Sequence, residues 1–243
     1  MLWGVVTGIV FGASALWVLL TQPTFSKSSS KSPGMVATTT DPQRLRMHVE
    51  VLSTTFVPRD WRHIDNLDRT ATYISQALAA AGTEVSEQPY PMQANNENHG
   101  KTYRNVVGKL GPDTQDRIVV GAHYDAFGEY PGADDNASGV AALIEVARLL
   151  AKETLPLGVD LIAYSVEEPF TKDARGNFRT PDGGSAIHAA SLKRAGARVR
   201  LMFSLETLGY FDLKPSNQPV IRLFIVSEPT HLREPATSPD ALA

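Results

Sequence analysis

Residues 121–150 read GAHYDAFGEYPGADDNASGVAALIEVARLL, and they contain the clearest structural signals in the chain. The run just before His123, residues 118–122, is short, apolar and rich in β-branched side chains, as expected of a strand buried on both faces of a largely parallel sheet. After a glycine-rich turn, apolar residues from Val140 to Ala151 recur at helical spacing. The stretch therefore predicts a buried strand, a polar turn and an amphipathic helix.

His123 lies at the carboxyl end of the predicted strand, where open α/β sheets bind their ligands. Asp125 follows two residues later and can accept a hydrogen bond from the imidazole nitrogen that does not face a metal, which fixes the tautomer and the ring direction. A His-x-Asp pair alone is a weak signal, because both residues are common on protein surfaces. Its position at a strand end favours a metal ligand with an orienting carboxylate.

The turn at 131–139 contains two adjacent carboxylates, Asp134 and Asp135, directly before the predicted helix. Adjacent carboxylates repel each other unless a cation or hydrogen-bond donors compensate their charge. Helix capping does not explain both of them, since Asn136 or Ser138 can also supply the cap. A bound metal ion would remove the repulsion.

A second carboxylate pair, Glu167-Glu168, follows the apolar run at 158–166, which has the length of a strand. Adjacent residues at a strand end point in different directions, so one carboxylate can bind a metal while its neighbour reaches a water on that metal. A general base must lie within hydrogen-bond reach of the proton that it removes, and a divalent metal lowers the pKa of a bound water from about 15.7 towards about 7. Two solvated glutamates are the alternative interpretation.

The motifs together resemble those of the cocatalytic zinc aminopeptidases, peptidase family twenty-eight. Between residues 105 and 211, the family's order and approximate spacing are kept by GAHYD, PGADDNASG, EE, GSAIHA and LETLGYF. The resemblance implies a zinc-exopeptidase-like fold. The alternation of predicted strands and helices likewise indicates an α/β domain with a mixed, mainly parallel sheet flanked by helices.

The resemblance also implies a site for two zinc ions and a role for each matching residue. It makes His123 a ligand of one ion, which Glu206 completes, and Asp135 the carboxylate that bridges to the second ion. Glu168 becomes a ligand of that second ion, and Glu167 becomes the general base. Imidazole nitrogen and carboxylate oxygen are ligands that zinc commonly takes. The implied reaction is hydrolysis of an N-terminal peptide bond by a metal-activated water, on a peptide whose free amino terminus lies near the metals.

The chain departs from the family after Glu206. Members supply a last His to the second zinc from a loop several tens of residues further on, whereas the only later histidine here is His231, in a proline-rich polar tail. We therefore expect a domain truncated at its carboxyl terminus, with a catalytically impaired or noncatalytic peptidase-like binding domain as the alternative. A glutaminyl-cyclase-like activity is a third possibility, which we favour less because that branch uses one zinc and does not need His123.

Residues 2–20 are uncharged and almost wholly apolar, and they are long enough to cross a bilayer as a helix. The expected organisation is a transmembrane anchor or signal segment at 1–21, a flexible linker at 22–40, the peptidase-like domain at 41–228 and an irregular tail at 229–243. This predicts a single-pass membrane protein. Lys27 and Lys31 favour a cytoplasmic domain by the positive-inside tendency, whereas similar enzymes act outside the cytoplasm, where we place the domain.

Composition limits the other classes of function. At 243 residues the chain can hold one globular domain with a sizeable core, and a net charge of −3 provides no basic face for nucleic acid. Cysteine is absent, which excludes disulfides and thiolate zinc sites. His188 lies in a helical pattern and is expected to pack rather than to bind metal.

The remaining elements are read from periodicity and turn signals. Two helices are expected before the motifs, at 42–56 and 66–81, with Gly82 ending the second. Further strands are expected near 84–90, 104–110, 199–205 and 220–226.

Overall fold

The computed structural model describes residues 40–94, 96–168 and 182–209. The predicted anchor at 1–21, most of the predicted linker, the strand expected at 220–226 and the tail with His231 lie outside the described residues. Within the described ranges, no helix combines the length and the apolar character needed to cross a bilayer.

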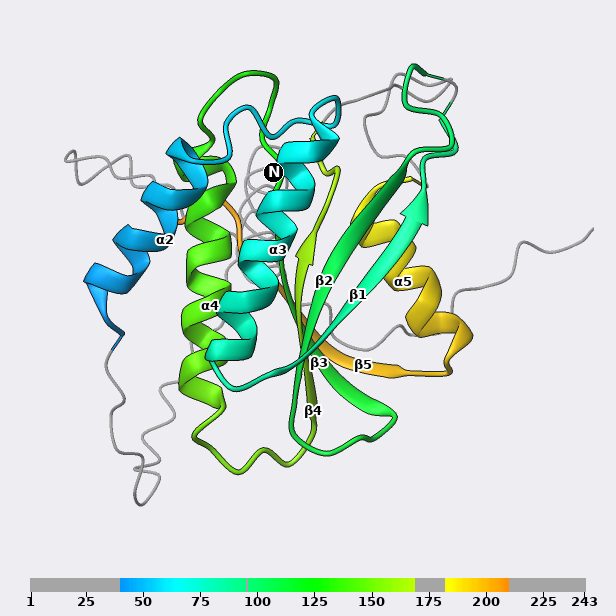
Figure 1. The fold of residues 1–243 in the computed structure, drawn as a ribbon. Coiled ribbons are helices and arrows are strands. Elements are labelled where there is room, and N and C mark those ends of the chain that lie inside the picture. The colour runs from blue at the N-terminus through cyan, green and yellow to red at the C-terminus, as the bar shows by residue number, and fades with distance from the viewer. Residues whose placement is uncertain (1–39, 95, 169–181, 210–243) are drawn as a thin grey trace, which may run out of the picture. The chain divides into compact units, whose positions relative to one another are not determined.

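A five-stranded mixed sheet forms the centre of the fold (Figure 1). Its strands are β1 (Glu84–Pro91), β2 (Thr102–Leu110), β3 (Asp116–His123), β4 (Gly158–Tyr164) and β5 (Arg198–Ser204). The strand order is β1-β2-β4-β3-β5, in which β2 is antiparallel to both of its neighbours and β3 is parallel to both of its neighbours. The mixed α/β class is confirmed. Four of the five strands run in one direction, although only two of the four pairings are parallel.

Helices cover both faces of the sheet (Figure 1). One face carries α3 (Ile64–Ala80) and α4 (Gly139–Leu150), with α2 (Pro42–Thr54) packed against α4. The other face carries α5 (Gly184–Arg194). The sheet is therefore the middle layer of three.

Each face of the sheet has its own hydrophobic core. Along the central strand β4, Leu161 and Ala163 join the larger core, which includes α3 and α4 residues. Ile162 and Tyr164 point the other way and join a smaller core against Leu192 of α5. Every residue of β4 is buried because both faces are covered, which explains why its sequence is a nearly continuous apolar run.

Two helix starts follow from local hydrogen bonding. α2 begins after Asp41, whose Oδ1 accepts a hydrogen bond from the Gln43 N–H at 2.9 Å, with Pro42 in the first turn. At the start of α4, Asn136 Oδ1 accepts a hydrogen bond from the Gly139 N–H at 3.0 Å. Of the two residues that the sequence offered for this role, Asn136 is therefore the one that satisfies the first turn of α4.

The carboxyl ends of three neighbouring strands meet at one edge of the sheet, here called the carboxyl edge. β4, β3 and β5 are parallel, and their last residues are Tyr164, His123 and Ser204. The register pairs His123 with Tyr164, and the Leu205 N–H donates to Gly121 O at 2.8 Å. The segments that leave these strands therefore begin side by side, as the motifs predicted.

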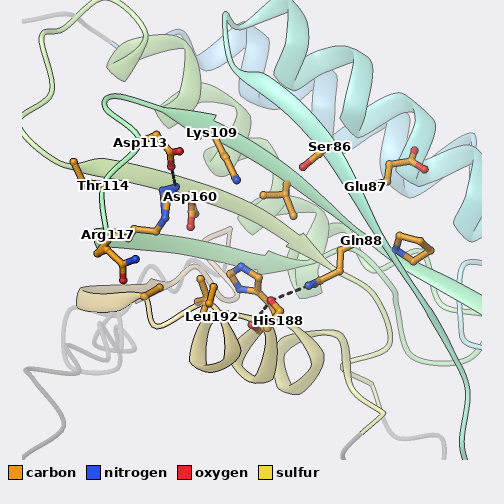
Figure 2. A pocket seen from close by; sticks show the side chains of 16 residues that line it. Ser86, Glu87, Gln88, Lys109, Asp113, Thr114, Arg117, Asp160, His188 and Leu192 are labelled. Atoms are coloured by element: carbon orange, nitrogen blue, oxygen red, sulfur yellow. Dashed lines mark hydrogen bonds and ion pairs between the residues drawn. The ribbon is translucent and has the colours of Figure 1, made fainter.

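A hollow of about 660 Å³ lies on the α5 side of the sheet (Figure 2). Its lining includes Lys109, Arg117, Asp160 and His188, and the described lining residues include none of the predicted metal ligands. Arg117 Nη1 lies 3.3 Å from Asp160 Oδ1, and Arg117 Nη2 lies 3.1 Å from Asp113 Oδ1. This α5-side hollow is thus a charged region separate from the carboxyl edge.

Candidate metal centre

His123 lies at the centre of a cluster of carboxylates at the carboxyl edge. Its side chain is 2 % exposed, and its Nε2 lies 3.0 Å from Asp135 Oδ1 and 3.1 Å from Glu206 Oε1. Glu167 Oε2 is further away, at 3.9 Å from the same nitrogen. On the other side of the ring, Nδ1 lies 3.3 Å from Asp125 Oδ1. Three of these carboxylates follow strands, namely Asp125 after β3, Glu167 after β4 and Glu206 after β5. Asp135 lies in the turn before α4, so four separate segments meet at one imidazole.

Asp125 connects the imidazole to the second carboxylate pair. Its side chain is fully buried, with Oδ1 accepting the Glu167 N–H at 3.1 Å and Oδ2 accepting the Glu168 N–H at 2.9 Å. The contact with His123 Nδ1 agrees with the orienting role that the sequence predicted. The two backbone contacts were not predicted, because they depend on the register between β3 and β4. One carboxylate thus positions both the imidazole and the backbone of the glutamate pair.

The turn η1 (Ala133–Ser138) directs Asp135 towards His123. Its backbone leaves helical geometry at Asp135 (φ −106°, ψ 95°) and Asn136 (φ −134°, ψ 40°), and the peptide bond between them is cis. Asn136 Nδ2 donates to Leu205 O at 2.8 Å, which connects the turn to the segment after β5. The half-exposed Asp135 side chain faces the imidazole, while the buried Asn136 side chain holds the turn.

The two adjacent aspartates have different partners. Asp134 Oδ1 accepts the Gly209 N–H at 2.8 Å, so a backbone donor compensates this carboxylate. Ser138 Oγ donates to Asp134 O and accepts the Leu208 N–H at 2.9 Å, so the Ser138 side chain makes no capping hydrogen bond to α4 although the residue directly precedes it. Asp135 is left to face the imidazole. This arrangement agrees with the choice of Asp135 over Asp134 as the metal ligand, a role that stays a prediction.

Two residues beside the predicted general base and a predicted metal ligand have left-handed backbone conformations. Val166 has φ 57° and precedes Glu167, and Thr207 has φ 47° and follows Glu206. A positive φ is unfavourable for a residue with a Cβ atom, and it is rare for a β-branched one. Such strain is typical of functional sites, where the surrounding structure holds the backbone in place. Propensity would not predict it, because both Val and Thr disfavour this conformation.

The carboxylates change the protonation of the groups around them. Burial lowers the pKa of His123, but hydrogen bonds with Asp125, Asp135 and Glu206 outweigh this effect and hold that pKa well above its usual value. Burial, together with the charges of Asp135 and Asp125, raises the pKa of Glu168 to about 7. Carboxylates that raise one another's pKa are a site of negative potential. The cluster therefore favours a bound cation.

The donor atoms of the cluster fit zinc. Two groups offer ligand atoms that lie within 4.8 Å of one another, namely His123 with Asp135 and Glu206, and His123 with Glu167 and Glu168. Imidazole nitrogen and carboxylate oxygen are typical zinc ligands. The first group is the set that the resemblance assigned to one ion. The second group differs from the predicted second site, in which Asp135 and Glu168 share an ion.

Fold and donor set together define an α/β domain with a candidate metal site. Residues 105–216 match the sequence model of Peptidase family M28, so the chain carries a domain of that family, and the resemblance read from its motifs is confirmed. YfbL, an uncharacterized protein of Escherichia coli, is 42 % identical over 185 residues, which cover 73 % of this chain and 53 % of that protein. Leucine aminopeptidase 1 of Arthroderma otae is 26 % identical over 155 residues, which cover 58 % of this chain and 39 % of that protein. The chain thus spans about half or less of these relatives.

Solved structures share the fold. The glutaminyl cyclase of Bacteroides thetaiotaomicron bound to N-acetylhistamine is 25 % identical with a TM-score of 0.54, covering 69 % of this chain and 62 % of that one. A leucine aminopeptidase precursor from the same organism is 24 % identical with a TM-score of 0.53 and the same coverage of 69 % and 62 %. A Zn-dependent exopeptidase from Parabacteroides distasonis is 21 % identical with a TM-score of 0.52, covering 69 % of this chain and 62 % of that one. The fold is therefore that of zinc exopeptidases, and the family supports zinc as the metal.

Proposed function

We propose that this chain is a zinc-dependent exopeptidase domain, most simply an aminopeptidase that hydrolyses the N-terminal peptide bond of a peptide. The observation that carries this proposal is the convergence of Asp135 and Glu206 on His123 Nε2, at 3.0 and 3.1 Å, from segments far apart in the sequence. Family membership and the named aminopeptidase relatives support the same class of reaction. A surface cluster of acidic groups without a function would not need a buried imidazole at its centre.

The proposal assigns the metal ligands by their place in the cluster. His123, Asp135 and Glu206, whose ligand atoms lie within 4.8 Å of one another, would hold one zinc ion. By the family resemblance, Asp135 and Glu168 would contribute to a second. Zinc bound there would supply a Lewis acid for the scissile carbonyl and a water with a lowered pKa. The high-pKa Glu168 carboxyl would lose its proton on binding metal, since ligands bind in their deprotonated form.

Glu167 is the residue that we assign to proton transfer. Its carboxylate lies beyond hydrogen-bond distance of His123 Nε2, at 3.9 Å, and it is 55 % exposed, so it is accessible to a substrate. Burial of part of the side chain raises its pKa above the usual value, which suits a group that must take a proton and then release it. Its Oε atoms would accept a proton from the attacking water and pass it to the leaving amine. Asp125 fixes the backbone from which this side chain extends.

The substitution Glu167→Gln tests this assignment, because it keeps the shape of the side chain and removes its basicity. We expect hydrolysis of amino-acid arylamides to fall by about 100-fold or more, the usual range for loss of a general base, while zinc content stays that of the wild type. A fall in zinc content would show that Glu167 is a ligand, as the second group of donor atoms allows. A wild-type chain that binds zinc and hydrolyses no arylamide would favour the noncatalytic binding domain.

Glutaminyl cyclisation is a second candidate activity. It is favoured by the likeness to the Bacteroides thetaiotaomicron glutaminyl cyclase, at 25 % identity and a TM-score of 0.54. The two reactions give different products from one substrate, a peptide that begins with glutamine. An exopeptidase releases free glutamine, whereas a cyclase releases ammonia and leaves the peptide with a cyclic amino terminus. Mass spectrometry of the products therefore decides between them.

A further inference from the structure

Arg59 is a buried arginine whose contacts are backbone carbonyl groups. Its side chain is fully buried, and its Nε donates to Tyr124 O at 2.8 Å. Nη1 donates to Leu52 O at 3.0 Å and to Pro131 O, and Nη2 donates to Gly132 O at 2.7 Å. A guanidinium group presents its N–H donors in a fixed planar fork, so four such contacts define the relative positions of the four carbonyls.

Three of the four carbonyls belong to the loop that connects two predicted metal ligands, and the fourth, Leu52 O, belongs to α2. Tyr124 directly follows His123, and Gly132 lies three residues before Asp135. The loop 124–132 separates the two predicted ligands, and Arg59 contacts both of its ends. The Arg59 backbone adds a further contact, because its carbonyl accepts the Ala126 N–H at 3.3 Å.

The contact at Gly132 leaves no room for a side chain. Gly132 has φ 57°, and a Cβ atom there would lie 2.7 Å from Arg59 Nη2 and 2.5 Å from Asp135 O. The turn before Asp135 is therefore built closely around the guanidinium group. This explains the glycine of the PGADD motif by local packing as well as by its backbone conformation.

Arg59 also places a positive charge behind the carboxylate cluster. Burial lowers its pKa to about 10, while the charges of Asp125, Asp135 and Glu168 act in the opposite direction, so the guanidinium stays charged at neutral pH. Burying a charge without an ion-pair partner is unfavourable. Backbone carbonyls and the nearby carboxylates offset this penalty here.

We propose that Arg59 is a positioning residue that holds the loop 124–132, and thereby keeps His123 and Asp135 at the separation needed to bind one zinc ion. The identity of the metal rests on the proposed function. Removal of residues that orient a metal ligand typically weakens metal binding by about 10- to 100-fold. A residue that only fills the core would lower stability without a selective effect on the metal.

The test compares Arg59→Met with a matched control, Arg117→Met. Arg117 is also largely buried, but its partners are Asp113 and Asp160, at the opposite end of β3 from His123. Zinc affinity is measured by chelator competition, and hydrogen exchange of loop 124–132 is measured in the metal-free proteins. We expect Arg59→Met to weaken zinc binding by about 10- to 100-fold and to speed exchange in the loop, and Arg117→Met to do neither.

Arg59→Lys keeps the charge but cannot reproduce the planar fork, so we expect an intermediate loss of zinc affinity and a folded protein if the Met variant does not fold. Wild-type zinc affinity and loop exchange in the Arg59 variants, with only a lower melting temperature, would overturn the proposal. A wild-type chain that binds no zinc would overturn the proposed function instead. The exchange measurement on metal-free protein would still decide whether Arg59 holds the loop.

Discussion

The carboxyl edge and the α5-side hollow both contain a buried histidine among charged side chains, but the charges are balanced in only one of them. At the edge, His123 faces carboxylates on both sides of its ring, and its pKa is raised. In the hollow, burial lowers the pKa of His188 to about 4, with Lys109 and Arg117 acting in the same direction, and Arg117 pairs with Asp160.

This difference separates a site that favours a cation from a charged region that is already compensated. The His188 ring packs against Tyr164 with centroids 5.8 Å apart, in agreement with the expectation that it packs rather than binds metal. Buried charge alone therefore does not indicate a metal site in this fold. An excess of carboxylates around an imidazole does, as at His123.

Replacing each histidine by alanine should give the largest difference between the carboxyl edge and the hollow. We expect His123→Ala to bind zinc at least about 100-fold more weakly, since even residues that only orient a ligand account for about 10- to 100-fold. His188→Ala should keep wild-type zinc affinity and instead lower stability, because it leaves a cavity next to Tyr164. Zinc titration and thermal melting of both variants check this. Equal losses of zinc affinity would show that the two regions are not functionally distinct.

Added zinc should stabilise the folded protein by binding at the carboxyl edge and not in the hollow. At a free zinc concentration about 1,000 times the dissociation constant, binding stabilises the folded state by about 4 kcal/mol. Calorimetry with zinc and with a chelator measures this increment. It should shrink in Glu206→Gln, which loses a predicted ligand, and persist in His188→Ala. An unchanged increment in Glu206→Gln would remove Glu206 from the ligand set.

In metal-free protein the two regions should respond oppositely to acid. The lowered pKa of His188, about 4 against a usual 6.5, means that stability is lost as the pH falls through this range, by at most about 3 kcal/mol. The raised pKa of Glu168, about 7 against 4.5, means that stability is gained as the pH falls from 7 to 4.5. His188→Gln should therefore reduce the fall in melting temperature on acidification, and Glu168→Gln should increase that fall. Parallel melting curves for all three proteins between pH 7 and 4.5 would contradict both assignments.

The smallest effect concerns the strained backbone of the edge. Thr207→Gly should relieve the left-handed strain and raise stability by about 1 kcal/mol, which corresponds to about 2–4 °C in melting temperature. Gly196, with φ 67° next to residues that line the hollow, already avoids such strain. Gly196→Ala is therefore the matched reverse change and should destabilise by a similar amount. A stabilising Gly196→Ala would show that φ is not the deciding factor.

The elements with local signals could be predicted closely. The helix expected at 66–81 is Ile64–Ala80, and the strand expected at 104–110 is Thr102–Leu110. Helical periodicity and apolar runs with turn signals at their ends are properties of neighbouring residues. The direction of β2, which runs against the four other strands, depends on pairing over long sequence distances and has no such signal.

The candidate site likewise contains residues that the sequence indicates and contacts that it does not. His123, Asp135 and Glu206 were selected by motif, and the structure brings them within contact distance. Arg59 and the backbone contacts of Asp125 were missed, because neither the first arginine of PRDWR nor a hydrogen bond across two strands leaves a pattern in the sequence. The left-handed Val166 runs against the propensity of its residue type. Sequence motifs thus indicate the ligands, and the three-dimensional register provides what holds them.

The position of Glu206 has a consequence for biosynthesis. It follows β5, the edge strand of the described sheet, and side chains of the η1 turn hold the segment 205–209 beside His123. A nascent chain can form β3, η1 and β4 while β5 is still inside the ribosome, but the imidazole then lacks one carboxylate. With Glu206 as a proposed ligand, the complete ligand set at His123 would form only after β5 has docked. Metal binding would then follow the docking of β5 and would not act as a template for β3 and β4.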